Sequence, residues 1–263
     1  MNRFAERRVL VTGAASGIGQ ATVLRLLEEG GTVVAADVSD DGLKRTVTLA
    51  AAAGSAERLD TTTIDIGDEA SVIDGVSESI DKLGGLDVLV NAAGILRASH
   101  THDTSLDLWN QVIGINLTGT FIVVRECLPA LLRCERSVVV NFSSTSATFA
   151  HPYMAAYAAS KGGIQSFTHA LSLEYGKQGL RAVSVAPGSI KTGITDATAG
   201  YVPPDADWTL FAKLSPILPT TLESGGAAMG GPEQVAGVVA MLASDDGAFI
   251  TGTEIRIDGG THA

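Results

Sequence analysis

The chain has 263 residues, of which 45% are hydrophobic and 18% are charged. This composition excludes an intrinsically disordered chain and is typical of a protein with a well-buried sheet. The formal net charge of −11 disfavours non-specific attraction to nucleic acid or to an anionic membrane.

The two cysteines, Cys127 and Cys134, predict no disulfide framework. If both lie on one helix, their Cα atoms are about 10 Å apart, whereas a disulfide needs less than about 7 Å. Free thiols predict a cytoplasmic protein. The first apolar run, Val9–Val11, is too short for the core of a signal peptide. We expect no stretch that could span a bilayer, and therefore a soluble chain.

Short apolar runs alternate along the chain with stretches that have apolar residues at helical spacing. The runs are rich in β-branched residues and mostly apolar at both alternating positions, which is typical of strands buried on both faces of a parallel sheet. They are Arg8–Val11, Thr32–Ala36, Thr62–Ile66, Leu86–Val90, Ser137–Phe142, Ala182–Ala186 and Glu254–Ile257. The helical stretches are Gly19–Glu29, Asp40–Ala53, Glu69–Leu83, Leu106–Arg133, Ala155–Lys177 and Glu233–Ala243.

This alternation predicts right-handed crossovers and a Rossmann-type α/β fold, with a doubly wound, mostly parallel sheet of seven strands and helices on both faces. No linker, repeat or low-complexity tract divides the chain, so one domain is expected over residues 1–263. Gly193–Gly231 breaks the rhythm with prolines and glycines. Such a segment inside a compact domain is typically functional or disordered, and we interpret it as a mobile substrate lid.

A glycine-rich turn, Thr12–Gly19, directly follows the first expected strand and opens the first expected helix. Gly13 would allow a tight turn, Gly17 a close approach of the backbone to a pyrophosphate, and Gly19 close packing of helix and strand. The helix N-terminus would offer free N–H groups to phosphates. A P-loop is excluded because no Gly-Lys-Ser/Thr follows. A plain tight turn is the competing interpretation.

Asp37 ends the second expected strand, about 20 residues beyond the glycine turn. A carboxylate there can accept hydrogen bonds from an adenosine ribose, and its charge would repel a 2′-phosphate. No Arg or Lys stands at Ser16, Val38 or Ser39 to bind such a phosphate. The sequence therefore predicts NAD rather than NADP as cofactor. The alternative is that Asp37 simply caps the next helix.

Ser144, Tyr157 and Lys161 are the candidate catalytic residues. Tyr157 and Lys161 are four positions apart and would share one face of a helix. A neighbouring ammonium would pull the pKa of the phenol down from its ordinary value near 10. Such a tyrosine could exchange a proton with a substrate oxygen during hydride transfer. The spacing alone is also typical of surface residues, but Ser144 ends a buried strand, at the edge where ligands bind in open α/β sheets.

The sequence resembles the short-chain dehydrogenase/reductase family over essentially its full length. The motifs that carry this resemblance are Thr-Gly-x-x-x-Gly-Ile-Gly at Thr12–Gly19, Asn-Ala-Ala-Gly at Asn91–Gly94, Asn116, Ser144, Tyr157-x-x-x-Lys161, and Pro187-Gly188 followed by Thr192.

The resemblance implies roles for four catalytic residues. Tyr157 would be the general acid/base, and Ser144 would hold and polarise the substrate oxygen. Lys161 would bind the nicotinamide ribose and lower the pKa of the tyrosine. Asn116 would hold a water that links Lys161 to solvent. Asn116 could instead be a buried polar group satisfied by backbone.

The resemblance also implies a cofactor-binding set. Asp65, beside Ile66, would contact the adenine amino group, and the Asn91–Gly94 segment would line the adenosine side. Asn91 could instead only tie neighbouring strands together, and Pro187-Gly188 could be a strand-ending turn. The full set is Gly13, Ser16, Gly17, Ile18, Gly19, Asp37, Asp65, Ile66, Asn91, Ala92, Ala93, Gly94, Tyr157, Lys161, Pro187, Gly188, Ile190 and Thr192. No metal site is expected.

Two features bear on the substrate. Ser146 and Thr148 add polar groups after the catalytic serine, and His151 is a candidate substrate contact or an ordinary surface or core histidine. The lid is rich in apolar and aromatic residues, which suits a hydrophobic alcohol but could equally pack onto the body or another subunit. It has no cluster of Lys or Arg, since Lys213 is nearly alone, and this disfavours an anionic substrate.

The sequence therefore predicts an NAD-dependent oxidoreductase that interconverts a secondary alcohol and a ketone. One alternative is a 3-oxoacyl-[acyl-carrier-protein] or 3-oxoacyl-CoA reductase, and a more distant one is a non-catalytic dinucleotide sensor. The resemblance further implies a homotetramer, with the helices at Leu106–Arg133 and Ala155–Lys177 in one interface and the C-terminal strand near another.

Overall fold

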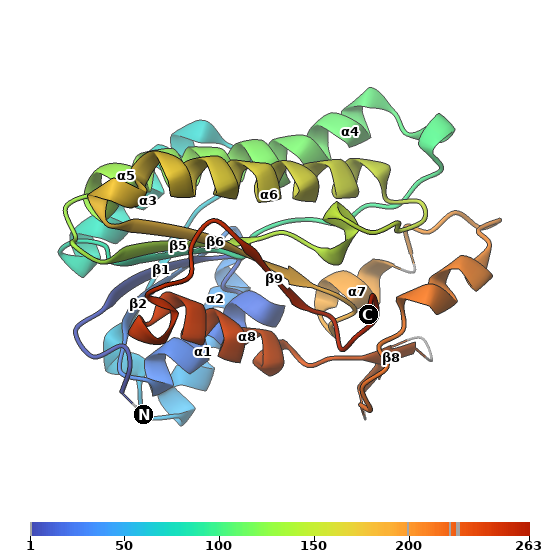
Figure 1. The fold of residues 1–263 in the computed structure, drawn as a ribbon. Coiled ribbons are helices and arrows are strands. Elements are labelled where there is room, and N and C mark those ends of the chain that lie inside the picture. The colour runs from blue at the N-terminus through green and yellow to red at the C-terminus, as the bar shows by residue number, and fades with distance from the viewer. Residues whose placement is uncertain (1, 199, 221, 225–226) are drawn as a thin grey trace.

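A parallel sheet of seven strands lies at the centre of the computed structural model, which describes residues 2–198, 200–220, 222–224 and 227–263 (Figure 1). The strand order is β3, β2, β1, β4, β5, β6, β9, and every neighbouring pair is parallel. In that order the strands span Leu59–Thr63, Thr32–Asp37, Arg8–Thr12, Val88–Asn91, Ser137–Phe142, Leu180–Pro187 and Glu254–Ile257. The predicted fold class is confirmed.

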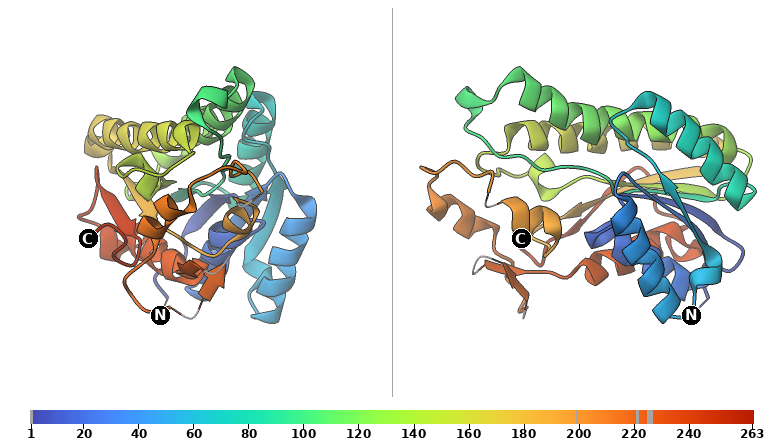
Figure 2. Two further views of the ribbon diagram at one scale, coloured as in Figure 1. Left: turned by 90° about the vertical axis from the view of Figure 1, so that its right-hand side faces the viewer. Right: turned by 180° about the vertical axis from the view of Figure 1, so that it is seen from behind.

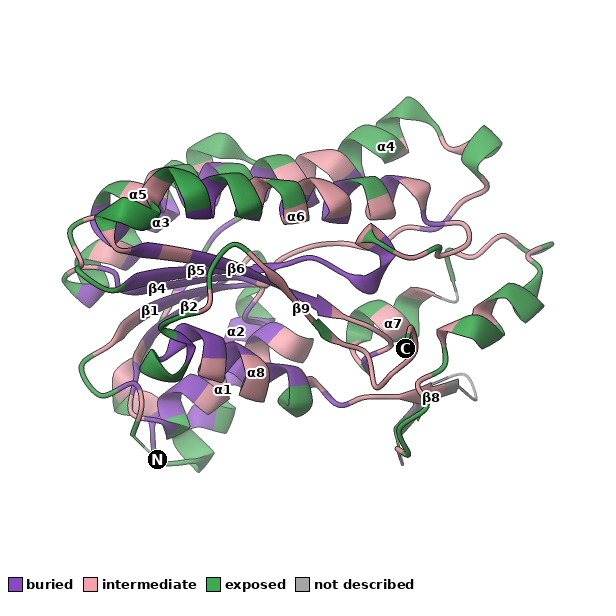
Figure 3. Ribbon diagram, viewed as in Figure 1, coloured by how far each residue is buried: buried purple, intermediate pink, exposed green. Residues whose placement is uncertain are grey.

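The central strands are buried on both faces, because helices cover the sheet from both sides (Figure 3). One core lies between the sheet and helices α1 (Gly17–Glu28), α2 (Asp40–Ala52) and α8 (Pro232–Ala243). The other lies between the sheet and helices α3 (Glu69–Leu83), α5 (Thr120–Leu131) and α6 (Ala155–Tyr175). Along each strand, successive apolar side chains point to opposite faces of the sheet and so belong alternately to the two cores.

The third strand differs from its prediction. The sequence predicts Thr62–Ile66, whereas β3 spans Leu59–Thr63 and pairs with Val33–Asp37 of β2. Beyond Asp37 the chain turns into α2, so β2 offers no further partner. Ile64 and Ile66 are nevertheless buried, which explains why their apolar pattern imitates a strand. The remaining helix and strand boundaries shift by no more than a few residues.

The predicted helix Leu106–Arg133 is divided by a change of winding. It consists of α4 (Leu106–Ile113), a π-helical turn (Gly114–Gly119) and α5. By length and composition, Leu106–Leu131 could cross a membrane, so the expectation that no stretch could do so is wrong. In the fold, 39% of the most apolar 18-residue stretch of this helix is buried. Helix α5 packs against α3, and α4 packs against α6.

The predicted lid contains short elements and is therefore not irregular throughout. Its described residues form α7 (Gly193–Thr198), a 3₁₀-helix (Trp208–Leu214), and an antiparallel pair of strands, β7 (Leu222–Ser224) and β8 (Ala227–Met229). The lid projects from the end of the molecule where the strands have their carboxyl ends (Figure 2). That the lid moves stays a prediction.

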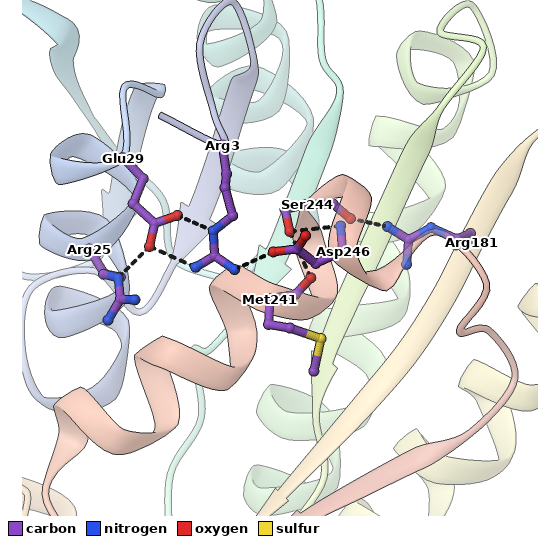
Figure 4. Close-up of polar contacts among 7 residues, drawn as sticks. All are labelled: Arg3, Arg25, Glu29, Arg181, Met241, Ser244 and Asp246. Carbon is purple, nitrogen blue, oxygen red and sulfur yellow. Dashed lines mark hydrogen bonds and ion pairs between the residues drawn. The ribbon is translucent and has the colours of Figure 1, made fainter. Parts of the chain in front are cut away.

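The N-terminal arm is held to the body by a charged cluster at the opposite end of the sheet (Figure 4). The Arg3 guanidinium donates to both carboxylate oxygens of Glu29, at 2.6 and 2.7 Å, and to Asp246 at 2.8 Å. Arg25 donates to the same Glu29 carboxylate at 2.5 Å. Glu29 is 3% exposed, and the hydrogen bond from Arg3 lowers the pKa of its carboxyl group. This cluster joins the arm, α1 and the segment after α8.

We expect the substitution Glu29→Gln to lower the free energy of unfolding by about 2–4 kcal/mol, because Arg25 loses its carboxylate partner and Arg3 keeps only Asp246. Urea unfolding would measure the change. Glu28→Gln, which alters the exposed neighbouring residue, should change stability by less than about 0.5 kcal/mol. Equal losses in the two variants would contradict this account of the cluster.

Candidate active site

A cleft of about 290 Å³ opens at the carboxyl edge of the sheet, between the loops that follow β1, β2, β3, β4 and β6. This is the position where the strand order reverses between β1 and β4, and where open α/β sheets bind ligands. Among the residues predicted to bind a cofactor, those that line the cleft are Gly13, Ser16, Gly17, Ile18, Gly19, Asp37, Asp65, Ile66, Ala92, Ala93, Gly94 and Thr192.

The glycine turn is built against the loop that follows β4. Gly13 has φ +70°, and a Cβ there would lie 2.5 Å from the Ala93 backbone nitrogen, so no other residue fits without movement. The N-cap of α1, Ser16, makes no capping hydrogen bond with its side chain. The N–H groups of the first turn and the positive end of the helix dipole are thus available to an anion in the cleft.

Asp37 is held in a fixed orientation beside the glycine turn. Its carboxylate accepts hydrogen bonds from the Ala15 N–H at 3.1 Å and the Ser39 N–H at 2.9 Å. The N-cap of α2 is Ser39, whose side chain accepts from the Gly42 N–H at 3.2 Å. Asp37 is therefore not the helix cap that the alternative interpretation made of it.

Asp65 and Ile66 lie in the turn after β3 rather than in a strand. The Asp65 carboxylate accepts from the Gly67 N–H at 2.8 Å, which fixes the turn. Both residues line the same cleft as Asp37 and the glycine turn.

The structure brings Ser144, Tyr157 and Lys161 together. Ser144 follows β5, while Tyr157 and Lys161 occupy successive turns near the start of α6. The Ser144 side chain hydrogen-bonds the Tyr157 phenol. The Lys161 ammonium lies 5.7 Å from the centroid of the Tyr157 ring and donates to the Phe142 carbonyl at 2.7 Å.

Burial determines the ionisation of this group. It raises the pKa of Tyr157, with the hydrogen bond from Ser144 acting in the opposite direction. Burial also lowers the pKa of Lys161 to about 8. Lys161 is not among the causes of the Tyr157 pKa shift in this arrangement, so its expected lowering of the tyrosine pKa stays a prediction. Desolvation disfavours both charged forms, and the ammonium directs its hydrogen bond to a carbonyl rather than to the phenol.

Asn116 lies in the π-helical turn and fastens the loop after β4. Its amide group accepts from the Ile95 N–H at 2.8 Å and donates to the Ile95 carbonyl at 2.9 Å and to Ser160 at 3.1 Å. A Cβ on Gly94 would lie 3.1 Å from the Asn116 Oδ1 and 3.6 Å from the Lys161 Nζ. The side chain is thus satisfied by the Ile95 backbone and the Ser160 hydroxyl, and Asn116 and Lys161 both lie next to Gly94.

His151 lies close to the catalytic serine segment. Its Nε2 is 3.2 Å from the hydroxyl of Thr145, which follows Ser144 in the chain. Burial, together with the neighbouring His262, lowers the pKa of His151 to about 4. The imidazole is therefore neutral near pH 7. The described part of the chain contains no group of three or more His, Cys, Asp or Glu side chains that could hold a metal ion.

Comparisons with known proteins show the family to which the chain belongs. Residues 13–262 match the family model described as enoyl-(acyl carrier protein) reductase. The 3-oxoacyl-[acyl-carrier-protein] reductase of Thermotoga maritima is 35% identical, covering 98% of each chain. Meso-2,3-butanediol dehydrogenase of Serratia marcescens is 34% identical, covering 99% of this chain and 96% of that one. The NAD-bound structure of a short chain dehydrogenase from Mycobacterium paratuberculosis is 28% identical, with a TM-score of 0.88 and 98% of each chain covered. The chain belongs to the short-chain dehydrogenase/reductase family.

Besides Tyr157 and Lys161, four residues of the predicted cofactor-binding set do not line this cleft: Asn91, Pro187, Gly188 and Ile190. The Asn91 side chain donates to Asn141 at 2.9 Å and ties β4 to β5. The Pro187 carbonyl accepts from Thr145, and the Gly188 N–H donates to the Ile257 carbonyl at 3.0 Å. Ile190 is 5% exposed and belongs to the core beneath α8. In this family member these residues support the loops around the cleft, Pro187 and Gly188 through their backbone groups.

Sequence reasoning missed several residues of the cleft. They are Thr12, Ala36, Val38, Ile64, Ile95, Ile115, Phe142, Gly193 and Ile194. Most directly adjoin predicted residues, so extending each motif by one position would have found them. Ile115 adjoins Asn116 and enters the cleft from the π-helical turn. Phe142 and Ile194 are different, because each lies two positions from a predicted residue, Ser144 and Thr192 respectively.

Proposed function

We propose that this protein is an NAD-dependent oxidoreductase that interconverts a secondary alcohol and a ketone, with Tyr157 as general acid/base. The observation that carries this proposal is the contact between Ser144 and Tyr157, with Lys161 beside them, at the edge of the sheet that also bears the cleft. The family's named relatives include alcohol dehydrogenases and ketone reductases, which supports the same reaction class.

Each residue of the group has a distinct task in this reaction. The Ser144 hydroxyl holds the substrate oxygen, and the Tyr157 hydroxyl exchanges a proton with it. Lys161 stays close to both because its ammonium is anchored on the Phe142 carbonyl. When bound, NAD supplies the acceptor for the hydride of the carbon that bears the hydroxyl group.

The cleft residues suit a dinucleotide. The uncapped first turn of α1 would face the phosphates, and Asp37 would accept hydrogen bonds from the adenosine ribose. Asp65 would contact the adenine, while Lys161 and Thr192 would hold the nicotinamide half. A carboxylate beside the ribose favours NAD over NADP, because it would repel a 2′-phosphate. The NAD-bound M. paratuberculosis relative is consistent with this choice.

The competing function is the reduction of a 3-oxoacyl thioester. The T. maritima relative carries that name, so this alternative has a specific observation in its favour. Asp37 opposes it, since reductive biosynthesis in related proteins usually draws on NADP. The apolar lid, in which Lys213 is the single Lys or Arg, also favours a hydrophobic alcohol over a carrier-bound anion. A non-catalytic dinucleotide sensor is disfavoured by the intact Ser144, Tyr157 and Lys161.

Replacing Tyr157 by Phe should reduce kcat for alcohol oxidation with NAD by about 10²- to 10⁴-fold, because the proton acceptor is lost while the ring remains. Tyr175→Phe, at the other end of α6, is the matched control and should keep full activity. A screen of hydrophobic secondary alcohols, followed by NADH absorbance, measures both. Unchanged turnover in Tyr157→Phe would overturn the mechanism.

The same assay gives the pH dependence. Because burial raises the pKa of Tyr157, the phenol persists at neutral pH, where it can act as an acid but not as a base. Oxidation of the alcohol, which needs the base, should accelerate as pH rises from about 6 to about 10. Reduction of the ketone, which needs the acid, should slow over the same range.

The variant Asp37→Ala should bind NADH about tenfold to a hundredfold more weakly than the native protein, because a charged hydrogen-bond acceptor to the ribose is removed. Tryptophan fluorescence titration with NADH and with NADPH measures the change. Native protein should prefer NADH, and the variant should lose that preference.

Two controls separate the ribose contact from a local disturbance. The Ala15 and Ser39 N–H groups bond different carboxylate oxygens of Asp37, so Asp37→Asn keeps an acceptor for one of them and removes the charge. It should relax the discrimination against NADPH. Asp41→Ala removes an exposed carboxylate of α2 and should bind NADH normally. If the native protein binds NADPH as tightly as NADH or more tightly, the reduction of a 3-oxoacyl thioester would become the better-supported function.

A homotetramer in the cytoplasm completes the proposal. Large apolar side chains are exposed on the helices expected in one interface, including Leu173 on α6 at 87% and Phe121 on α5 at 43%. Phe249, shortly before β9, is fully exposed near the other expected interface. Multi-angle light scattering at micromolar protein should give four times the 27.0 kDa subunit mass. A mass near 27.0 kDa would contradict the assembly.

A further inference from the structure

The loop that joins the Ser144 segment to α6, residues 148–154, is fastened to the lid by Tyr153. The phenol oxygen of Tyr153 accepts the Asp207 N–H at 2.8 Å. Its ring stacks on Phe211, with centroids 6.0 Å apart and planes at 25°. Phe211 in turn packs on Trp208 at 5.1 Å. Tyr153 therefore touches the lid through both its hydroxyl and its ring.

Tyr153 has an unusual backbone conformation. Apart from the glycines, Glu6 and Tyr153 are the only described residues with positive φ, and Tyr153 has φ +64°. Side chains other than those of Gly, Asn and Asp rarely adopt this conformation, so surrounding contacts must maintain it. The Tyr153 carbonyl accepts the Ser99 N–H at 2.8 Å, and the ring meets His100 edge-on at 5.1 Å.

The segment beneath Tyr153 also binds the lid. His100 Nε2 lies 2.9 Å from the Asp205 carboxylate, and the Arg97 guanidinium covers the Tyr201 ring at 4.5 Å. The lid stretch 201–211 is thus docked on two neighbouring pieces of the body. Of the three residues that make these contacts with the lid, Tyr153 alone lies in the segment that leads directly into α6.

The C-terminal tail, residues 258–263, contacts both the loop 148–154 and the lid. His262 stacks on Phe149 with centroids 4.1 Å apart and planes at 3°. The Gly259 carbonyl accepts the N–H groups of Ile217 and Leu218, both at 3.0 Å. The tail thus touches both the loop 148–154 and the far end of the lid, so that lid, loop and tail support one another at the carboxyl end of the sheet (Figure 2).

We propose that Tyr153 is a positioning residue that couples the lid to the catalytic tyrosine. Met154, the next residue, is the N-cap of α6, and Tyr157 lies in the first turn of that helix. When the lid leaves, Tyr153 loses its contacts with Asp207 and Phe211, and only the body contacts with Ser99 and His100 remain to maintain its positive φ. The start of α6 and the Tyr157 hydroxyl then shift, and displacements of about 1 Å suffice to impair proton transfer. The catalytic consequence rests on the proposed function, whereas the lid contact does not.

Limited trypsin digestion tests the lid contact without any substrate. Lys213 is the only Lys or Arg in residues 193–231, so the cleavage rate at Lys213, followed by mass spectrometry, reports lid opening. Tyr153→Phe keeps the ring but loses the acceptor for the Asp207 N–H, and should raise this rate about two- to tenfold. Tyr153→Asn tolerates the positive φ but loses the ring as well, and should raise it further. Tyr175→Phe is the hydroxyl-deletion control and should cleave at the native rate.

Kinetics test the coupling to Tyr157. Both Tyr153 variants should lower kcat for alcohol oxidation in the order of their cleavage rates, while the Kd for NADH and the thermal midpoint stay close to native values. A merely structural role would instead lower the thermal midpoint and NADH affinity together. Native cleavage rates, or faster cleavage with native kcat, would overturn the proposal. If Tyr153→Asn does not fold, Tyr153→Phe decides alone. Absence of turnover in the native protein would refute the proposed function, and the cleavage rates would still decide whether Tyr153 holds the lid.

Discussion

All strands of the central sheet run in the same direction, and the candidate site depends on this constraint. Each strand must be followed by a crossover on one face, so every loop at a carboxyl end meets the others along a single edge. The strand order reverses between β1 and β4, where the crossovers depart to opposite faces and leave a crevice. The glycine turn, Asp37, Asp65 and Gly94 reach the same cleft from four different loops for this reason.

Burial of polar groups at this edge has a cost that local hydrogen bonds offset. Lys161 is 6% exposed and Ser144 is 7% exposed, so each needs a partner inside the protein. The Phe142 carbonyl supplies one for Lys161 and the Tyr157 phenol one for Ser144. The same desolvation moves the pKa of Lys161 towards neutrality and that of Tyr157 away from it. The site is therefore set for a neutral phenol at physiological pH.

Much of this could be read from residue order and spacing. The alternation of β-branched runs with amphipathic stretches determined the α/β class, because only a parallel sheet covered on both faces buries such runs. Gly13 and Asp37 were placed by their distance from strand ends. Ser144, Tyr157 and Lys161 were grouped because helical periodicity puts Tyr157 and Lys161 on one face. These inferences are local, and local geometry does not depend on the rest of the chain.

Only the tertiary structure decided the features that depend on partners distant in sequence. β3 ends at Thr63 because β2 turns away at Asp37, which no property of Ile64 or Ile66 reveals. Asn116 lies in a π-helical turn and binds the Ile95 backbone. The raised pKa of Tyr157 follows from burial, which the spacing to Lys161 cannot report. The sequence by itself determined the class of fold and the identity of the reactive groups, since both follow from short-range pattern. Strand ends, ionisation and the docking of the lid were decided by packing, because each depends on which distant segments exclude water around it.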